Sequence, residues 1–367
     1  MSQNRTWPKF ASAKEFSRAI KAIENDYFQE GNAEGRVKTG DWRLWHKAVV
    51  LLTLFFSIFG ILLFTEYSGW IKILLCIVLG VITASIGFNV GHDANHGSFC
   101  ANKKRNNSFR LSFNLHGIFA FFWREKHNVL HHTYTNMNGF DEDISGVRIL
   151  RMHPDQPWRS IHRYQVLYCW FLYGLLHIGW VWFNDFKKYF QGHIEKKKLH
   201  MEKKDHLNFW MTKIFFATFF CALPWIVLGF KTWIIGYLIY EFSVGLITSI
   251  VFQLAHVVEK TSQPSVLVAT EEEWILHEVL TTANFGMKNK VLSWFVGGLN
   301  FQIEHHLFPK VSHVHYPVLS IKVQKVCEEH GVPYNKYSSF WSGLASHIRK
   351  MAELGKKPKA VLSLTTS

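Results

Sequence analysis

The chain has 367 residues, of which 48% are hydrophobic and only 19% are charged, and its formal net charge is +14. The basic residues gather around long apolar runs instead of alternating with them, which favours a membrane protein and argues against a nucleic-acid-binding one. The five cysteines are scattered, form no CxxC pair and are odd in number, so they indicate neither a disulfide framework nor a thiolate zinc site.

The N-terminal segment, residues 1–47, is polar and rich in lysine and arginine, so we expect no cleavable signal sequence there. Two apolar runs follow, Ala48 to Phe64 and Trp70 to Val90, with only "TEYSG" between them. A helix of about 20 apolar residues is long enough to cross a bilayer. This part of the chain therefore predicts a transmembrane hairpin with a very short outer turn.

A second pair of runs, Phe209 to Gly229 and Trp233 to Phe252, is joined by "FKT" and predicts a second hairpin. The remaining basic clusters lie at Lys103 to Arg110 and at Lys187 to Lys204. Both clusters fall at the same end of the two hairpins as the basic N-terminal segment. The excess of positive charge predicts that this end faces the cytoplasm.

Two further apolar segments do not fit a span. Leu111 to Trp123 is too short, and a crossing by Gln165 to Phe183 would expel the basic run that follows it from the cytoplasm. We expect both to lie along the membrane surface or against the protein, as the many tryptophans and tyrosines of the longer one suggest. Glu241 falls inside the fourth span, where we expect it to be hydrogen-bonded within the bundle.

Histidines cluster at the cytoplasmic ends of these spans. "GHDANHGSF" places His92 and His96 four residues apart, on one face of a helix that continues the second span. "KHNVLHHTYTN" repeats this spacing between His127 and His131 and adds the neighbouring His132.

Two more segments bring histidines to the same face. The fourth span ends in "FQLAHVVE", which contains His256, and "FQIEHHLFPK" carries Gln302, His305 and His306 at i, i+3 and i+4. Neutral imidazole suits iron, copper, nickel and zinc. Eight histidines exceed the four positions of a tetrahedral zinc site, so the sequence predicts two metal ions. A metal transporter would need ligands near the midplane of the membrane, which makes that alternative weak.

The segments "HDANH", "HNVLHH" and "QIEHH" resemble the three histidine boxes of the membrane fatty-acid desaturase family. The glutamine that opens the third box resembles the front-end desaturases, which act between an existing double bond and the carboxyl end of the acyl chain. The resemblance includes "HHTYTN", "DEDI" and "TTANF", runs from about Trp42 to Pro309, and is strongest to bacterial linoleoyl-CoA desaturase-type enzymes.

This resemblance implies an all-α integral membrane protein, with four transmembrane helices in two hairpins under a cytoplasmic helical cap that holds a di-iron site. The activity implied is oxygen-dependent insertion of a double bond into an acyl chain at two non-haem iron ions. The implied iron ligands are His92, His96, His127, His131, His132, His256, His305 and His306.

Several further residues are candidates for the same site. Gln302 stands where many relatives have a ninth histidine, and His277 is a possible substitute ligand. Metal-bound imidazoles usually donate their second N–H to an acceptor. The candidate acceptors are Asp93, Asp141, Glu142, Asp143 and Glu304.

The resemblance also implies partners. The acyl substrate is carried by CoA, by a carrier protein or by a lipid, and the sequence leaves this choice and the double-bond position open. The N-terminal segment is too short for a fused cytochrome b5 domain, so we expect a separate donor of the ferredoxin or cytochrome b5 type. A hydroxylase on the same di-iron scaffold remains the main alternative.

The expected organisation has three parts: the cytoplasmic segment 1–47, a membrane catalytic domain at 48–315, and a cytoplasmic helix and tail at 316–367. We expect the protein in a bacterial inner membrane, with the active site facing the cytoplasm.

Overall fold

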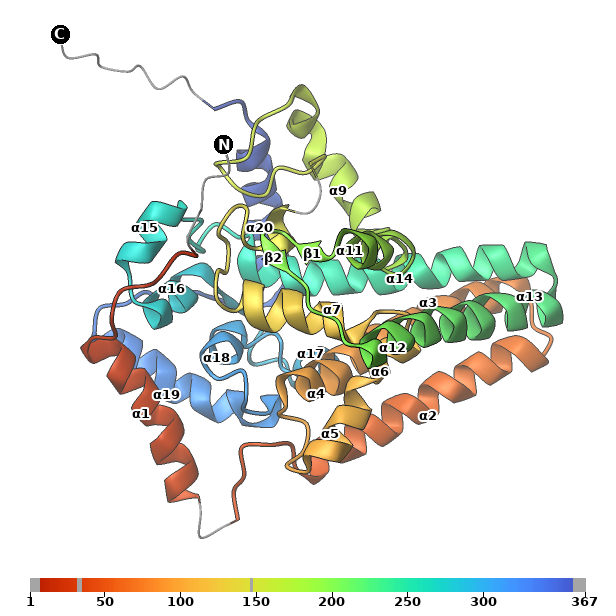
Figure 1. Cartoon of the computed structure of the whole chain (residues 1–367), viewed down its shortest axis with the longest axis horizontal. Helices are drawn as coiled ribbons and strands as arrows, with labels where there is room; N and C mark the ends of the chain where they lie inside the picture. Colours follow the sequence, from red (N-terminus) through yellow and green to blue (C-terminus); the bar gives the residue numbers. More distant parts are fainter. Residues whose placement is uncertain (1–6, 32–34, 146–147, 359–367) are drawn as a thin grey trace.

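A computed structural model describes residues 7–31, 35–145 and 148–358. Long helices run side by side in one half of the molecule, and shorter helices form a cap at one end of them (Figure 1). The last nine residues of the expected tail lie outside the described residues.

Four helices in the described part of the chain are long and apolar enough to cross a membrane, in agreement with the predicted spans. Each begins or ends a few residues beyond its predicted apolar core, because polar and basic residues continue the helices past the hydrocarbon-length segment. They are α2 (Trp42–Phe64), the continuous helix Gly69–His96 formed by α3 (Gly69–Ile86) and α4 (His92–His96), the helix Lys203–Leu228 formed by α12 (Lys203–Phe216) and α13 (Leu223–Leu228), and α14 (Phe230–His256).

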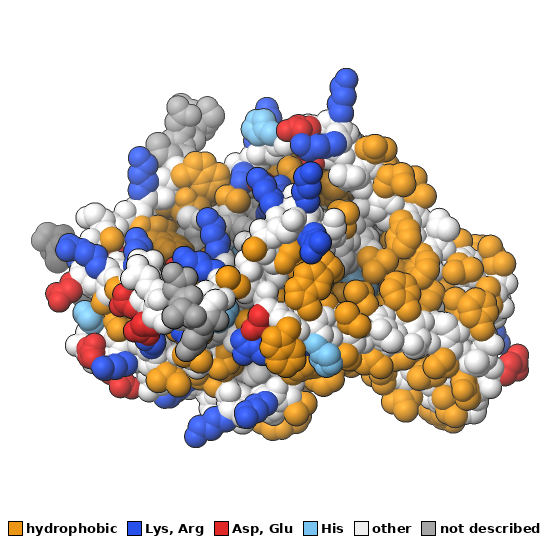
Figure 2. Space-filling model, turned by 90° about the horizontal axis from the view of Figure 1, so that it is seen from below, with side chains coloured by type: hydrophobic (Ala, Val, Ile, Leu, Met, Phe, Trp, Pro, Cys, Tyr) orange, Lys and Arg blue, Asp and Glu red, His pale blue; other side chains and the backbone are white. Residues whose placement is uncertain are grey.

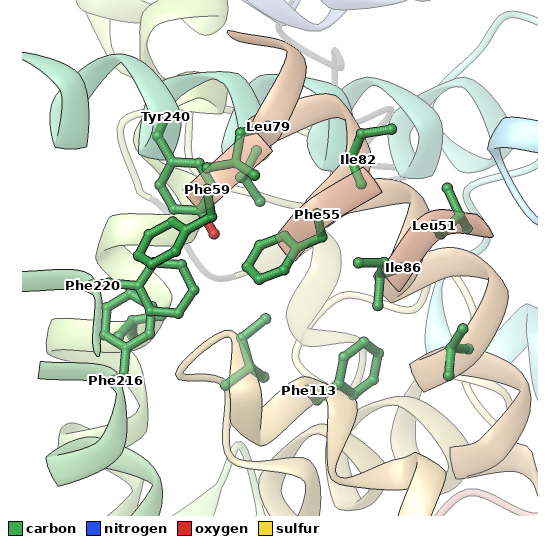
Figure 3. Close-up of a cluster of buried hydrophobic side chains, with 14 of the residues drawn as sticks. Leu51, Phe55, Phe59, Leu79, Ile82, Ile86, Phe113, Phe216, Phe220 and Tyr240 are labelled. Atoms are coloured by element: carbon green, nitrogen blue, oxygen red, sulfur yellow. The ribbon is translucent and has the colours of Figure 1, made fainter. Parts of the chain in front are cut away.

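Helix α3 packs between α2 and α14, and α13 closes the bundle against α14. Aromatic side chains fill the space between these helices (Figure 3). The ring of Phe220 stacks on that of Tyr240, with 5.7 Å between the centroids, and lies 6.1 Å from that of Phe55. Close packing of these rings holds the spans together, since van der Waals contact drives helix association in lipid, where burying apolar surface gives no hydrophobic gain.

The longer of the two apolar segments that were not expected to span the membrane, Gln165 to Phe183, lies in a bent pair of helices. The helix Ser160–Gly174, which includes α9 (Gln165–Gly174), meets the helix Leu176–Gln191, made of α10 (Leu176–Gly179) and α11 (Asp185–Gln191), at an angle of 63°. Both α9 and α10 pack on α14. Close packing requires glycine here, because a Cβ on Gly245 of α14 would lie 2.5 Å from the carbonyl oxygen of Gly174.

The cap is formed by the two ends of the chain and the loops between spans. α1 (Glu15–Glu30) packs on α19 (Tyr316–Glu329), and α16 (Trp274–Thr281) packs on α18 (Gln302–Leu307). The shorter cap helices are α5 (Lys103–Arg110), α6 (Ser112–Leu115), α7 (Ala120–Arg124), α8 (Glu142–Ser145), α15 (Val266–Glu271) and α17 (Lys290–Phe295), and α20 (Phe340–Gly355) lies against α9 and α14.

Two very small sheets depart from the all-α expectation. β1 (His193–Ile194) pairs antiparallel with β2 (Lys197–Lys198), and β3 (Asn284–Phe285) pairs in parallel with β4 (Lys336–Tyr337), so that Asn284 is opposite Lys336. These two short sheets join loops of the cap, and the rest of the architecture is helical.

Charge and apolar surface separate along the molecule. In Figure 2 hydrophobic side chains dominate the half built by the long helices, whereas lysine, arginine and acidic side chains gather over the cap. This separation is the pattern expected of a protein embedded in a bilayer at one end, since charged side chains are costly inside hydrocarbon.

Candidate metal centre

The first histidine segment lies where the second span enters the cap. After α3 the helix widens into a π-helical turn at Gly87–Gly91 and resumes as α4, which carries both histidines. The rings of His92 and His96 are 4.7 Å apart, as the four-residue spacing predicted. The helix ends at Gly97, whose φ of +80° is readily adopted only by glycine.

The second segment also lies on a π-helical turn, Glu125–His131, which continues α7. A π-helical turn is closed by i→i+5 hydrogen bonds, here from the N–H of His132 to the carbonyl oxygen of His127, so His127 lies next to His132 as well as His131. The Nε2 atoms of His127 and His132 are 3.2 Å apart. The i, i+4 prediction had treated this segment as an ordinary α-helix, and the extra residue in the turn brings the third histidine to the same point.

The third histidine segment forms α18, a helix of six residues. The loop before α18 holds it against the first histidine segment. Gly297 has φ +60°, and a Cβ there would lie 2.5 Å from the carbonyl oxygen of Phe88, so this loop approaches the first π-helical turn closely. The Nε2 of His305 is 3.0 Å from the Nε2 of His132. His256, at the end of α14, has its ring 4.9 Å from that of His306.

All eight histidines predicted as ligands therefore meet in one place. Seven of them are buried and His96 is nearly so. Their ligand atoms form overlapping groups in which every atom lies within 4.8 Å of the others. These groups are His92, His96, His127 and His305; His131, His256 and His306; His132, His305 and His306; and His127, His131 and Asp143.

The donor atoms in this cluster suit metal ions. Both ring nitrogens of His92 and the Nε2 atoms of His96 and His306 are buried without a hydrogen-bond partner among the described residues. An orphaned buried polar atom is costly unless a ligand satisfies it. A very small cavity lies between the histidines, and Gln302 lines it together with His92 and His305. The Oε1 of Gln302 is also buried without a partner, so the residues present fit metal binding.

Three carboxyl groups contact imidazoles of the cluster. Asp141 Oδ2 lies 3.0 Å from the Nδ1 of His131, and Asp143 Oδ2 lies 3.4 Å from the same atom. Glu278 Oε2 lies 2.6 Å from the Nδ1 of His306 and accepts a second hydrogen bond, of 3.0 Å, from the Thr135 hydroxyl. Such contacts fix the ring so that Nε2 faces the metal position.

The other candidate acids have different partners. Asp93 accepts from Ser312 and contacts the Nδ1 of His313 at 3.0 Å, while the Nδ1 of His92 is 3.7 Å away. Glu142 pairs with Lys188. Glu304 accepts hydrogen bonds from Asn284 and Tyr334, and burial raises the pKa of its carboxyl to about 7.

Burial controls the charge of the cluster. It holds the pKa values of His127, His132, His305 and His306 well below the ordinary range for histidine, and the neighbouring imidazoles lower them further. These rings are therefore neutral, which leaves a lone pair for a metal. Burial also lowers the pKa of His131, but Asp141 more than reverses this, so that the pKa of His131 is raised.

Sequence reasoning selected His277 and missed its neighbour. His277 belongs to none of the metal-capable groups of the described residues, and its ring lies 5.1 Å from that of Phe10. Glu278, one residue on, contacts the cluster instead. The available signal was a buried-type carboxylate in the apolar segment "WILHEVLTT", which is unusual in a core helix unless it has a partner.

The comparisons with known proteins agree with this centre. The model of the fatty acid desaturase family matches residues 68–338, which include all eight histidines. The chain belongs to the fatty acid desaturase family. It is thus an oxidoreductase that introduces double bonds into fatty acyl chains, and the resemblance of its histidine boxes to front-end desaturases is confirmed.

Relatives of this desaturase match it over nearly its whole length. It is 32% identical to the sn-1 linoleoyl-lipid 6-desaturase of Synechocystis sp., over 95% of this chain and 98% of the relative. It is 33% identical to the protein of the same name from Arthrospira platensis, over 97% of each chain. The acyl-lipid (8-3)-desaturase of Physcomitrium patens is 30% identical, over 94% of this chain and 72% of its own length.

Membership of this family, together with the four apolar helices, makes the desaturase an integral membrane protein that acts on a fatty-acyl substrate and requires an electron donor. A narrow apolar cavity, lined in part by His92, lies between α3, α10 and α14. A larger, more polar hollow shares Leu176, Trp180 and Phe252 with it. Phe252 also lines the small cavity between the histidines, so the three spaces adjoin.

Proposed function

We propose that this chain is a front-end acyl-lipid desaturase that inserts a double bond into an already unsaturated acyl chain at two non-haem iron ions. The observation that supports this proposal best is the buried cluster of eight convergent histidines next to an apolar cavity. The names of the cyanobacterial relatives favour a linoleoyl chain linked to a lipid, and the 6-position, over the CoA and carrier-protein alternatives.

The four metal-capable groups suggest how the histidines divide between two ions. His92, His96, His127 and His305 would hold one ion, and His131, His256 and His306 the other. His132 lies within reach of both sets, because its ligand atom groups with His305 and His306 and touches His127. Gln302 lines the space between the histidines and offers an amide oxygen there.

Two bound iron ions would supply an oxidant made from dioxygen, which is needed because no side chain can remove hydrogen from an unactivated methylene. The overall reaction converts –CH2–CH2– to –CH=CH– and reduces one O2 to two waters, with two electrons from a donor and two protons from solvent. The polypeptide positions the chain and keeps the site dry.

Residues of the chain carry out these tasks. Trp123 and Phe113 line the apolar cavity beside His92 and would hold the reacting carbons close to the ligand cluster. Asp141 and Glu278 fix the orientation of two imidazoles. Phe252 stands where the acyl cavity, the polar hollow and the histidine cavity adjoin, so its ring would restrict water reaching the cluster.

The arrangement in the membrane is part of the same proposal. The four spans would form two hairpins, with the cap and all four histidine segments on the cytoplasmic side of a bacterial membrane, because the basic clusters gather at that end. On this proposal residues 48–315 form the catalytic unit, and 1–47 and 316–367 complete its cap. A separate ferredoxin or cytochrome b5 would deliver the electrons.

Expression in a host that makes linoleoyl lipids but lacks 6-desaturation tests the proposal. Mass spectrometry of fatty-acid methyl esters should reveal a new double bond between the existing unsaturation and the carboxyl end. The variants His131→Ala and His305→Ala should insert in the membrane but give no product. A hydroxylated product, or normal product from both variants, would contradict the proposal.

A further inference from the structure

Two histidines outside the metal centre line the apolar cavity beside it. His116, between α6 and α7, and His177 of α10 contribute to its wall, which is otherwise formed mainly by apolar side chains. Both are buried, with 2% and 3% of their surface exposed. Neither belongs to a metal-capable group of the described residues.

Three of their four ring nitrogens lack partners among the described residues. Neither Nδ1 nor Nε2 of His116 has a hydrogen-bond partner among the described residues, and the Nε2 of His177 has none either. The other nitrogen of His177 lies 2.7 Å from Glu241 Oε2, which bears out the expectation that this glutamate is hydrogen-bonded inside the bundle. Glu241 therefore fixes the ring of His177, whose Nδ1–H donates to the carboxyl oxygen and whose Nε2 is left as an acceptor.

The position of His116 is fixed by aromatic rings. Its centroid lies 5.4 Å from that of Phe55, in an edge-to-face contact, and 6.4 Å from that of Phe220. Figure 3 shows these two phenylalanines in the packed interior of the bundle. Burial, with a smaller contribution from His177, lowers the pKa of His116 to about 3, so the ring is neutral and carries one N–H.

We propose that the N–H group of His116 recognises a cis double bond already present in the acyl substrate. This inference rests on the proposed function, because a front-end desaturase requires a substrate whose existing double bond lies on the methyl side of the reacting carbons. His92 and His116 line the same cavity, so a chain whose reacting carbons lie beside the ligand cluster would pass the ring of His116.

The physical basis is a difference in how two acyl chains satisfy the buried N–H of His116. Water can satisfy this N–H while the cavity holds no lipid, because the Nε2 of His177 offers a polar partner in the same cavity wall. An acyl chain displaces that water. A saturated chain then leaves the donor unpaired, whereas the π electrons of a cis double bond accept a weak hydrogen bond. The site therefore selects unsaturated chains largely by penalising saturated ones.

Competition between linoleoyl and stearoyl chains on the same lipid head group tests this inference. The purified holoenzyme would be given both lipids together, and their equilibrium binding and their conversion would be measured. His116→Phe keeps an aromatic ring but removes the donor, and His116→Gln keeps a donor. His206→Phe, on the exposed face of α12, makes the same chemical change away from the cavity.

We expect the preference for the linoleoyl chain to fall by about two- to fivefold in His116→Phe, as loss of one weak hydrogen bond implies, and to stay near the wild-type value in His116→Gln and His206→Phe. His116→Met serves as the second donor-free variant if the phenylalanine variant does not fold. An unchanged preference in the donor-free variant, or an equal loss in His116→Gln, would overturn the inference. A wild-type protein that desaturates neither lipid would instead refute the proposed function.

Discussion

The hydrogen bond between Glu278 and His306 offers the sharpest test of the metal centre. Glu278 Oε2 lies 2.6 Å from His306 Nδ1, and neither residue has exposed surface. Loss of a partner of this kind typically lowers metal affinity 10- to 100-fold. Since a tenfold change corresponds to about 1.4 kcal/mol, the pair is expected to contribute about 1.4 to 2.8 kcal/mol to iron binding.

Two substitutions of Glu278 should lower the iron affinity by different amounts. Glu278→Gln keeps the shape and an acceptor oxygen for the Nδ1–H of His306, so we expect a loss of about tenfold, at the low end of the range. Glu278→Ala removes the acceptor and leaves the Nδ1–H of His306 buried and unpaired, so we expect a loss of up to about 100-fold. The assay is iron retention by the detergent-solubilised protein across a graded series of chelator concentrations, with thermal melting measured in parallel.

Glu304→Gln is the matched control. Glu304 is as deeply buried as Glu278 and lies next to a predicted ligand, but its hydrogen bonds come from Asn284 and Tyr334 instead of an imidazole. We expect it to change thermal stability while iron retention stays within about twofold of wild type. Equal iron loss in Glu304→Gln and Glu278→Gln, or wild-type retention in Glu278→Ala, would refute the role assigned to Glu278.

Three other predictions concern the metal, the membrane and Gln302. Purified protein should contain two irons per chain and little zinc, and chelation should abolish desaturation, with recovery on addition of Fe²⁺ but not Zn²⁺; recovery with zinc would contradict an iron centre. Cysteines placed at Lys103 and Lys197 should label from the cytoplasmic side and one at Ser68 from the other side; outside labelling at Lys197 would mean that the bent helix pair crosses the membrane. Gln302→Ala should lose most activity but keep most of its iron. Gln302→His should bind iron at least as well as wild type but have lower activity, because the imidazole would fill a position that water or oxygen needs. Full activity of Gln302→His would show that residue 302 is an ordinary ligand position.

Local patterns in the sequence were enough to find the spans and the ligand candidates. Apolar runs of bilayer length need no tertiary context, because the lipid alone dictates that composition and length. The spacing of His92 and His96 likewise follows from the period of a helix. Together with the charge bias they predicted that the four histidine segments meet, and the structure places all eight histidines within one cluster.

Only the tertiary structure decided the contacts between distant segments. Glu278 and Glu304 are both acids in apolar surroundings, yet only Glu278 reaches an imidazole, because the packing of α16 on α18 sets that pairing. The π-helical turn that joins His127 to His132, and the 63° bend that shapes the apolar cavity, also depend on neighbouring helices. Periodicity and hydropathy describe a segment by itself, whereas these features are fixed by side chains far away along the chain.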